Sequence, residues 1–356
     1  MGFGATITGV GAYAPPGILT NEDFEKLVDT SDEWIVQRTG MKRRHIAAPH
    51  QATSDVAVPA ALAALDAAGR KPADVDCVIV ATATPDHLFP ATACLVSSRL
   101  GIEGKAAFDI SIACSGFVYA LTLAASLIRS GLYNTVLVLG AETLSKLVDY
   151  TDRTTCVLFG DGAGAVLVER SSGEDCFLGS DLGAEGADPS LLYLPGGGSR
   201  LPFSANGKAE NRRAGFIHME GKAVFKFAVN QMAHSTRAAL KQAGLTPHDV
   251  DVLIPHQANQ RIVDATVKML KLPDDRCVCN IAEYGNTSSA SIPLALADAL
   301  RDGRIRKNSI VVFVAFGGGL SWGAVVWRWK DATVGAVPPE QEHPYRYPPF
   351  GAKAGL

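Results

Sequence analysis

The segment AALDAAGRKPADVD, residues 63–76, returns later in the chain as AALKQAGLTPHDVD, residues 238–251. Nine of the 14 positions are identical, at a constant offset of 175 residues. In each copy an Ala- and Leu-rich helical pattern ends at a Gly, a turn containing Pro follows, and an apolar run begins, Cys77–Ala81 or Val252–Pro255. The shared Pro and the shared Asp-Val-Asp make chance similarity between two α/β units the weaker interpretation. The repeat predicts a chain made of two similar halves.

Helix and strand patterns also alternate in the rest of the chain. Apolar runs typical of buried strands, 106–110 and 135–139, lie on either side of a helical pattern at 115–129. Gly-rich segments at 157–164 and 314–319 predict a hairpin turn near the end of each half. We therefore expect an α/β fold of two βαβ-rich halves packed about a pseudo-twofold axis, with the functional site between them at the ends of strands.

The polar segment SSGED at 171–175 is the expected boundary between the halves. The N-terminal half is then 1–172 and the C-terminal half is 173–330. The remaining segment, 331–356, is rich in Pro and polar residues, and we expect an irregular surface tail. The polar, Gly-rich stretch 195–213 is expected to cover part of the entrance to the site.

Composition and charge exclude several classes of protein. Hydrophobic residues make up 47% of the 356 positions and charged residues 19%, which is typical of a compact enzyme. A net charge of -3 gives no general attraction to nucleic acid or anionic membranes. The start of the chain lacks the basic region of a secretory signal, and no apolar run reaches the roughly 18 residues of a membrane span. We expect a cytoplasmic protein that binds neither nucleic acid nor membrane.

The seven cysteines are scattered and odd in number, which predicts reduced thiols rather than a disulfide framework. Cys277 and Cys279 form a C-x-C pair, but no second Cys or His pair lies at zinc-site spacing, so we expect no metal site.

Cys114 stands apart because it follows the strand pattern 106–110 and precedes the helical pattern 115–129. The positive end of a helix dipole and its free N–H groups stabilise a thiolate, so we expect a lowered thiol pKa. Gly116 is expected to leave room for the carbonyl group of a substrate. A small residue at a strand–helix packing point explains Cys114 equally well on this segment alone.

Two further polar residues also follow strands. His256 comes directly after Val252–Pro255, whereas Ala81 occupies the equivalent position in the first half. Asn286 lies in the polar turn YGNTSSAS, 284–291, which opens a helical pattern at 290–300. Each residue alone has an ordinary interpretation, as a loop histidine and as a turn or helix-capping asparagine. Together with Cys114, they are expected at the ends of strands and ahead of helices.

At this point the sequence resembles a known family, β-ketoacyl-acyl carrier protein synthase III, the initiating condensing enzymes of type II fatty acid synthesis within the thiolase superfamily. The resemblance extends from about Ile7 to Arg328. It rests on several strings in the same order: TSDEWI at 30–35 with RTG at 38–40, ACSGF at 113–117, FGDGAG at 159–164, HQAN at 256–259, GNTS at 285–288 and FGGG at 316–319.

The family implies a thiolase-like fold and an acyltransferase reaction in two parts. An acyl group passes from acyl-CoA, with acetyl-CoA as the first choice, to Cys114. Decarboxylative condensation with malonyl-acyl carrier protein then gives 3-oxoacyl-acyl carrier protein, CoA and CO2. The resemblance implies a catalytic triad of Cys114, His256 and Asn286, an oxyanion hole from the backbone N–H groups of Cys114 and Gly318, and no cofactor.

The resemblance also implies ligand and partner contacts. Trp34 and Arg153 are placed on either side of the CoA adenine, and other positions follow the CoA and pantetheine channel: Thr30, Arg38, Gly221, Phe225 and Asn259. Phe89 matches a position in the acyl pocket of the neighbouring subunit, which implies a homodimer.

Three basic residues form a candidate docking site for an acidic carrier protein. Arg261 and Lys268 lie seven residues apart in a helical pattern at 260–271, hence roughly on one face, and Lys226 is the third member. A solvated helix face is the alternative interpretation.

Other enzyme classes fit less well. The string GVGAYA at 9–14 is similar to a dinucleotide-binding loop, but PPG at 15–17 prevents a helix from following it. A degradative thiolase needs a second cysteine-like base, which the turn at 316–322 lacks. A hydroxymethylglutaryl-CoA synthase needs an acidic base near the cysteine, and the sequence offers no candidate. A condensing enzyme of a secondary pathway with another starter acyl-CoA remains open, and a non-catalytic subunit is disfavoured by the intact triad.

Overall fold

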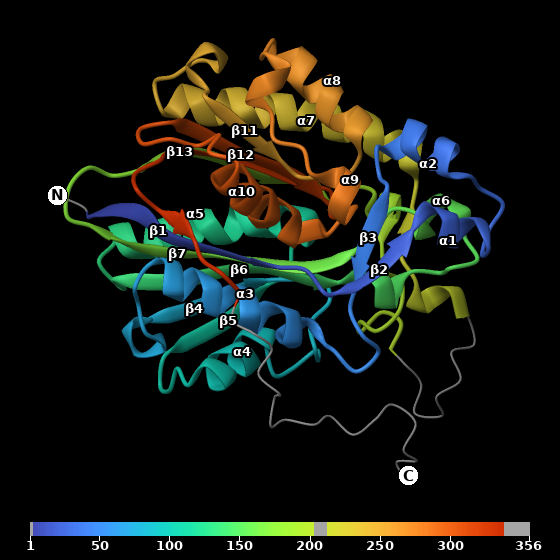
Figure 1. Ribbon diagram of the computed structural model, residues 1–356, viewed down its shortest axis with the longest axis horizontal. Helices are drawn as coiled ribbons and strands as arrows, with labels where there is room; N and C mark the ends of the chain where they lie inside the picture. The colour runs from blue at the N-terminus through green and yellow to red at the C-terminus, as the bar shows by residue number, and fades with distance from the viewer. Residues whose placement is uncertain (1–2, 203–211, 338–356) are drawn as a thin grey trace, which may run out of the picture.

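The computed structural model describes residues 3–202 and 212–337, which form two β-sheets and three layers of helices (Figure 1). The first sheet has the strand order β14-β1-β7-β6-β4-β5, and the second has the order β11-β12-β13-β8. The first contains β1 (Gly4–Tyr13), β4 (Cys77–Ala81), β5 (Ala106–Ile110), β6 (Thr135–Thr143), β7 (Asp161–Ser171) and β14 (Thr333–Val334). The second contains β8 (Phe177–Ala184), β11 (Val252–Pro255), β12 (Ile310–Gly317) and β13 (Ser321–Arg328).

Helices cover both faces of each sheet. Helices α5 (Gly116–Arg129) and α10 (Ser291–Arg301) lie between the sheets, α3 (Thr53–Ala67) and α4 (Thr92–Leu100) cover the first sheet from outside, and α7 (Gly221–Gln242) and α8 (Gln260–Leu270) cover the second. Both helices of the central layer bury most of their apolar side chains between the sheets. Phe117 of α5, for example, is fully buried and meets the ring of Phe313 from the second sheet edge-on.

The two halves repeat the same topology. In the first sheet β4 is parallel to β6, β6 is antiparallel to β7, and β7 is antiparallel to β1. In the second sheet β11, β12, β13 and β8 pair in the same order and directions. The repeated Pro turns form the short 3-10 helices η1 (Pro72–Asp74) and η6 (Pro247–Asp249). The predicted α/β fold of two similar halves about a pseudo-twofold axis is confirmed, whereas the boundary at residue 172 stays a prediction.

The repeat extends to the turns that open the central helices. Helix α5 is preceded by η2 (Ala113–Ser115), and α10 is preceded by η8 (Ser288–Ala290). Each turn begins with a non-glycine residue in the left-handed region, Ala113 with φ 48° and Ser288 with φ 49°. Such backbone is strained, and it persists only where the surrounding structure enforces it. The two turns carry Cys114 and Ser289 at equivalent positions.

Two expectations about local structure are wrong. No hairpin turn forms at 157–164, because β7 already begins at Asp161, and the chain between β6 and β7 makes an excursion through α6 (Arg153–Cys156). Val157, Leu158 and Phe159 of this excursion pack in a separate apolar cluster. The tail is not irregular throughout, because Thr333–Val334 pairs with β1 in parallel. Residues 338–356 of the tail and 203–211 of the Gly-rich stretch lie outside the described residues.

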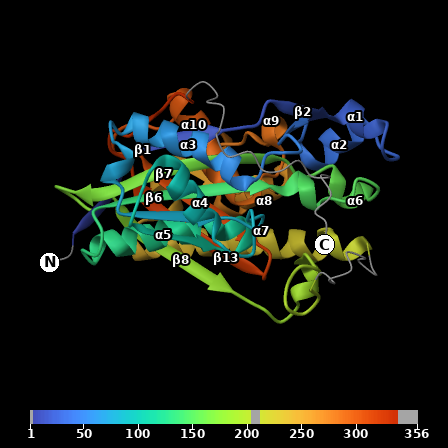
Figure 2. The same ribbon diagram turned by 90° about the horizontal axis from the view of Figure 1, so that it is seen from below.

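Shorter elements gather at one end of the sheets (Figures 1 and 2). They are β2 (Gly17–Thr20), α1 (Asn21–Glu25), α2 (Asp32–Thr39), β3 (Arg43–Ile46) and α9 (Ile281–Tyr284). Arg44 is fully buried here, where its guanidinium donates to Asn21 Oδ1 and to the carbonyl oxygen of Val157. This end of the molecule therefore braces the excursion between β6 and β7. In the parts of the chain that the structure describes, no helix is long and apolar enough to cross a membrane.

Candidate active site

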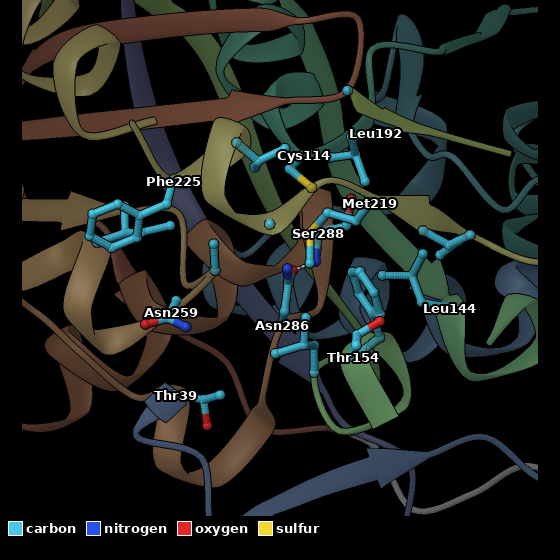
Figure 3. Close-up of a pocket in the computed structure, with 18 of the residues that line it drawn as sticks. Thr39, Cys114, Leu144, Thr154, Leu192, Met219, Phe225, Asn259, Asn286 and Ser288 are labelled. Carbon is cyan, nitrogen blue, oxygen red and sulfur yellow. Dashed lines mark hydrogen bonds between the residues drawn. The ribbon is translucent and has the colours of Figure 1, made fainter. Parts of the chain in front are cut away.

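A cavity of about 380 Å³ lies where the two halves meet. Cys114, His256 and Asn286 all line it, and they are 8%, 0% and 7% exposed. Trp34 is only partly buried and Arg153 is exposed, and both also line the cavity. The cavity therefore connects the surface to three buried polar side chains, two of which Figure 3 labels. The structure brings the predicted triad together.

Cys114 is held by backbone from both halves. It lies in η2, after β5 and ahead of α5, and its sulfur points into the cavity (Figure 3). A Cβ atom on Gly317, at the end of β12, would lie 2.8 Å from the Cys114 nitrogen and 3.0 Å from the Ser115 nitrogen. Only glycine permits this approach. The Ser115 and Ser321 hydroxyl oxygens, 2.6 Å apart, join the two halves at the same place.

Two expectations about this segment are wrong. Burial raises the pKa of the Cys114 thiol to about 12, although a hydrogen bond from Ser288 acts in the opposite direction. The helix start does not offset the loss of water around the sulfur, so the thiol is protonated at neutral pH in the ligand-free site. Gly116 does not make room for a substrate, because a Cβ atom there would lie 2.9 Å from the Ala81 Cβ atom. Its small size serves the packing of α5 against β4.

His256 follows β11, as predicted, and is anchored on both sides. Its backbone N–H donates to the carbonyl oxygen of Val314 at 2.7 Å, and its ring meets Phe316 edge-on. Nδ1 lies 2.7 Å from the Ser291 hydroxyl oxygen, whereas Nε2 is buried without a hydrogen-bond partner. Burial lowers the pKa of His256 to about 3, so the imidazole is neutral at physiological pH. Nε2 is the nitrogen left for a ligand in the cavity.

Asn286 is held by the excursion between β6 and β7. Its backbone N–H donates to the Leu158 carbonyl oxygen at 2.9 Å, and its own carbonyl oxygen accepts from the Gly160 N–H at 3.0 Å. The side-chain Oδ1 accepts from the Ser288 N–H at 2.9 Å, a bond drawn in Figure 3. Because Oδ1 is occupied in this way, the amide NH2 group is left as a donor toward the cavity.

Glu142 is the main residue of the site that the sequence did not reveal. The strand pattern was expected to end at 139, but β6 continues to Thr143 and buries Glu142 completely. Its carboxyl group lies beside the Ala83 N–H at 3.0 Å, the Thr84 hydroxyl at 2.6 Å and the Ser289 hydroxyl at 2.8 Å. An acid inside an otherwise apolar strand, TVLVLGAET, is the signal that could have identified it.

The same residue corrects the expectation that no acid lies near the cysteine. In its ionised form Glu142 would be close enough to raise the pKa of the Cys114 thiol further, after the larger effect of burial. It does not line the cavity, however, and polar groups of the protein surround it on all sides. Glu142 is therefore a buried structural acid and is not placed to act as a base on a ligand.

The residues expected to bind CoA mostly lie together. The Arg153 guanidinium lies 5.1 Å from the centre of the Trp34 ring, and that of Arg38 lies 5.5 Å from it. Gly221, Phe225 and Asn259 line the cavity as well, as does Gly318 near Cys114.

One of these positions differs from the expectation. Thr30 is not among the residues that line the cavity, and its hydroxyl is buried without a partner. Asn259 has a structural role in the ligand-free site, because its Oδ1 accepts from the Arg261 N–H at the start of α8 and its Nδ2 donates to the Arg38 carbonyl oxygen.

The three basic residues of the candidate docking site are exposed. Arg261 also lines the cavity, with its guanidinium 5.5 Å from the centre of the Phe225 ring, whereas Lys226 and Lys268 lie outside it. In the part of the chain that the structure describes, none of the three has an acidic partner within ion-pair distance. Phe89 does not line the cavity of its own chain and is 86% exposed.

A buried cysteine, a neutral histidine and an asparagine that meet between two repeated halves define a condensing enzyme of the thiolase-like class. Comparison with known proteins gives the family. The model of 3-oxoacyl-[acyl-carrier-protein] synthase III matches residues 108–186, and the model of its C-terminal part matches 240–329. The chain is 54% identical over 326 residues to β-ketoacyl-[acyl-carrier-protein] synthase III of Caldanaerobacter subterraneus, covering 92% of this chain and 98% of that protein.

Solved structures indicate the same family as the sequence comparisons. The 3-oxoacyl-[acyl-carrier-protein] synthase III of Aquifex aeolicus is 46% identical, with a TM-score of 0.85 over 92% of this chain and 100% of that one. The priming β-ketosynthase of the R1128 polyketide pathway is 34% identical, with a TM-score of 0.86 over 93% and 98% of the two chains. This chain belongs to the β-ketoacyl-acyl carrier protein synthase III family, and it is an acyltransferase of the condensing type. The expected thiolase-like fold is confirmed.

Proposed function

We propose that this enzyme catalyses the initiating condensation of type II fatty acid synthesis. An acyl group, with acetyl as the first choice, passes from acyl-CoA to Cys114 and is then joined to malonyl-acyl carrier protein. One observation carries the proposal: a single cavity connects the Trp34–Arg153 pair at the surface with Cys114, His256 and Asn286 in the interior. A planar adenine suits an indole ring and a guanidinium, and the pantetheine arm would reach inward from there.

In the first step the Cys114 sulfur attacks the thioester carbonyl of acyl-CoA. The carbonyl oxygen becomes an oxyanion, for which the backbone N–H groups of Cys114 and Gly318 are the proposed donors. The tetrahedral intermediate collapses, the bond to the CoA sulfur breaks, and an acyl-cysteine remains. Because burial keeps the Cys114 thiol protonated, its proton is lost as the carbon–sulfur bond forms and ends on the departing CoA thiol.

In the second step malonyl-acyl carrier protein occupies the cavity and its carboxylate leaves as CO2. The electron pair of the broken bond forms an enolate, whose oxygen needs hydrogen-bond donors. His256 Nε2 and the Asn286 amide are the proposed donors, since both line the cavity and have no partner on that side. The enolate carbon attacks the acyl-cysteine, and Cys114 leaves as thiolate. Decarboxylation supplies the carbanion, so the proposed reaction calls for no metal or cofactor.

The proposal includes a homodimer. Among the described residues β5 is an edge strand of the first sheet, and such edges pair readily with a second chain. The loop between β4 and α4 carries two exposed apolar side chains, Leu88 at 79% and Phe89 at 86%. In the proposed dimer Phe89 enters the acyl pocket of the other subunit, where its ring limits the length of the acyl chain.

The proposal also includes a location and a docking site. Seven free cysteines in the described residues fit the reducing conditions of the cytoplasm. Arg261, Lys226 and Lys268 are exposed, Arg261 lines the cavity, and none of the three has an acidic partner among the described residues, which suits an acidic carrier protein that delivers its substrate at this entrance.

The test follows the acyl group. Wild-type enzyme incubated with acetyl-CoA is expected to gain the mass of one acetyl group, located on the Cys114 peptide, and to lose it when malonyl-acyl carrier protein is added. A survey of straight and branched acyl-CoA primers then separates fatty acid initiation from a secondary pathway with another starter. An unmodified enzyme after exposure to every primer, or an acyl group that Cys114→Ser still accepts, would overturn the proposal.

A further inference from the structure

Ser291 is the first residue of α10, and its hydroxyl lies against the catalytic histidine. Its oxygen is 2.7 Å from His256 Nδ1, and the two residues are 2% and 0% exposed. The backbone N–H of Gln257 donates to the same oxygen at 3.4 Å. The Gln257 side chain holds this segment in place, because its Nε2 donates to the carbonyl oxygens of Pro255 and Val278.

The donors and acceptors around the Ser291 hydroxyl oxygen decide whether Ser291 or His256 Nδ1 donates the short hydrogen bond between them. A serine hydroxyl has one proton to donate and two lone pairs with which to accept. The Gln257 N–H occupies one lone pair. If Nδ1 carried the imidazole proton, it would occupy the second, and the serine proton would have no acceptor among the residues that the structure describes. A buried hydroxyl proton without an acceptor is an unfavourable state.

The opposite arrangement satisfies Ser291, the Gln257 N–H and Nδ1. Ser291 accepts from the Gln257 N–H and donates its own proton to Nδ1. A neutral imidazole carries a single proton, so that proton must then lie on Nε2. Among the residues that the structure describes, none is a hydrogen-bond partner of Nε2, and the ring lines the cavity.

We propose that Ser291 is a positioning residue that fixes neutral His256 as the Nε2–H tautomer and so makes the cavity-facing nitrogen a hydrogen-bond donor. The consequence for the reaction rests on the proposed function, in which this donor stabilises the enolate formed by decarboxylation. The first half-reaction does not depend on it, because backbone N–H groups hold the first oxyanion. Ser291 therefore acts on one half-reaction and not on the other.

The tautomer is measured directly by nitrogen NMR of full-length enzyme labelled at its eight histidines. The His256→Ala spectrum identifies the resonances of His256, and a protonated ring nitrogen is separated from a bare one by its chemical shift. Wild type is expected to show a protonated Nε2 and a bare Nδ1, whereas Ser291→Ala shows a mixture of both tautomers. A protonated Nδ1 in wild type would overturn the proposal, with or without any variant.

Kinetics supply the second readout. In Ser291→Ala, kcat for decarboxylation of malonyl-acyl carrier protein is expected to fall about 10- to 100-fold, the range seen when the orienting partner of a functional histidine is removed. KM and the rate of self-acylation by acetyl-CoA stay within about twofold. Ser291→Thr keeps the hydroxyl and is expected to restore decarboxylation and the single tautomer, which loss of packing alone would not explain.

Failure of this inference is distinct from failure of the proposed function. Wild-type rates of both half-reactions with one tautomer in Ser291→Ala, or equal loss of both half-reactions in Ser291→Ala and Ser291→Thr, would overturn the inference alone. Wild-type enzyme that neither accepts an acetyl group nor condenses it would overturn the function, and the NMR measurement would still decide the tautomer.

Discussion

The protonation state of Glu142 can be predicted from the donors around it. Ser289 has a single hydroxyl proton but lies 2.8 Å from two oxygens, the Ala81 carbonyl and Glu142 Oε1. If Glu142 is protonated, its O–H donates to Ser289, and Ser289 donates onward to Ala81. The Ala83 N–H and the Thr84 hydroxyl then donate to the remaining lone pairs of the carboxyl group. Burial raises the pKa of Glu142 above its ordinary value of 4.5, which agrees with a neutral acid.

A neutral acid can be replaced by an amide. In Glu142→Gln the amide N–H takes over the bond to Ser289 and the amide oxygen accepts from the other donors, so stability should change by less than about 1 kcal/mol. Glu142→Ala loses buried hydrogen bonds to four residues, Thr82, Ala83, Thr84 and Ser289, and leaves the Ala83 N–H without its acceptor. At about 1 kcal/mol for each partner and 1–3 kcal/mol for the unpaired group, the loss is about 5–7 kcal/mol.

The stability of wild type relative to Glu142→Gln should fall as the pH rises. The unfolded chain releases the Glu142 proton near pH 4.5, whereas the folded protein keeps it to higher pH. The unfolded state then binds fewer protons, so wild type loses stability relative to Glu142→Gln by about 1.4 kcal/mol per pH unit above this value. The loss stops where the folded acid ionises.

Equilibrium urea unfolding at pH 5, 6, 7 and 8, followed by tryptophan fluorescence, measures these differences. Glu103→Gln, at an exposed carboxyl group, is the matched control and should show no such dependence. The reasoning is refuted if Glu142→Gln costs as much as Glu142→Ala, or if wild type gains stability over Glu142→Gln as the pH rises, because both results require a buried carboxylate.

Three further predictions concern the cavity and its entrance. The rate of Cys114 alkylation by iodoacetamide, measured by peptide mass spectrometry, should rise about tenfold per pH unit from pH 7 to 9, because burial raises its thiol pKa to about 12. A plateau in this rate below pH 8 would show a lowered pKa. Gly317→Ala should slow self-acylation by about 100-fold, because the added methyl group displaces the backbone N–H of Cys114. Gly186→Ala is the control, because a Cβ atom there meets open space. Equal rates in the two variants would contradict the close approach of Gly317 to Cys114. Lys268→Glu should raise KM for malonyl-acyl carrier protein several-fold and flatten its salt dependence, since salt screens such attraction over about 10 Å at 0.1 M. Self-acylation is its control, and unchanged carrier-protein kinetics across a salt series would move the docking site elsewhere.

Much of the architecture could be predicted from the sequence because its signals are local and occur twice. The repeated helix–turn–strand unit fixes β4 and β11 in the same role, and the topology of both sheets follows that equivalence. The triad was predictable for the same reason. Cys114 and His256 follow β5 and β11, Asn286 precedes the turn that opens α10, and the packing of the two repeated halves brings these positions together.

What the sequence did not reveal depends on contacts between distant segments. The raised pKa of Cys114 results from burial by chain that lies up to about 200 residues away, such as Gly317. Glu142 and Ser291 acquire their importance from neighbours in the other half or on another element. No local pattern at 157–160 shows that these residues lie outside the sheet, where Leu158 and Gly160 hold Asn286. The CoA contacts, the docking site and the dimer stay predictions.

The paired turns η2 and η8 also bear on how many acyl groups one chain can carry. An internally duplicated chain begins with two equivalent candidates for a nucleophile, and here one is Cys114 while the other is Ser289. The Ser289 hydroxyl lies between Ala81 and Glu142, so its surroundings fasten the halves together and leave it no access to a ligand. The two equivalent turns therefore differ in role. Cys114 lines the cavity, whereas Ser289 joins the two halves. We therefore expect at most one acyl group per chain, on Cys114, because hydrogen bonds enclose Ser289.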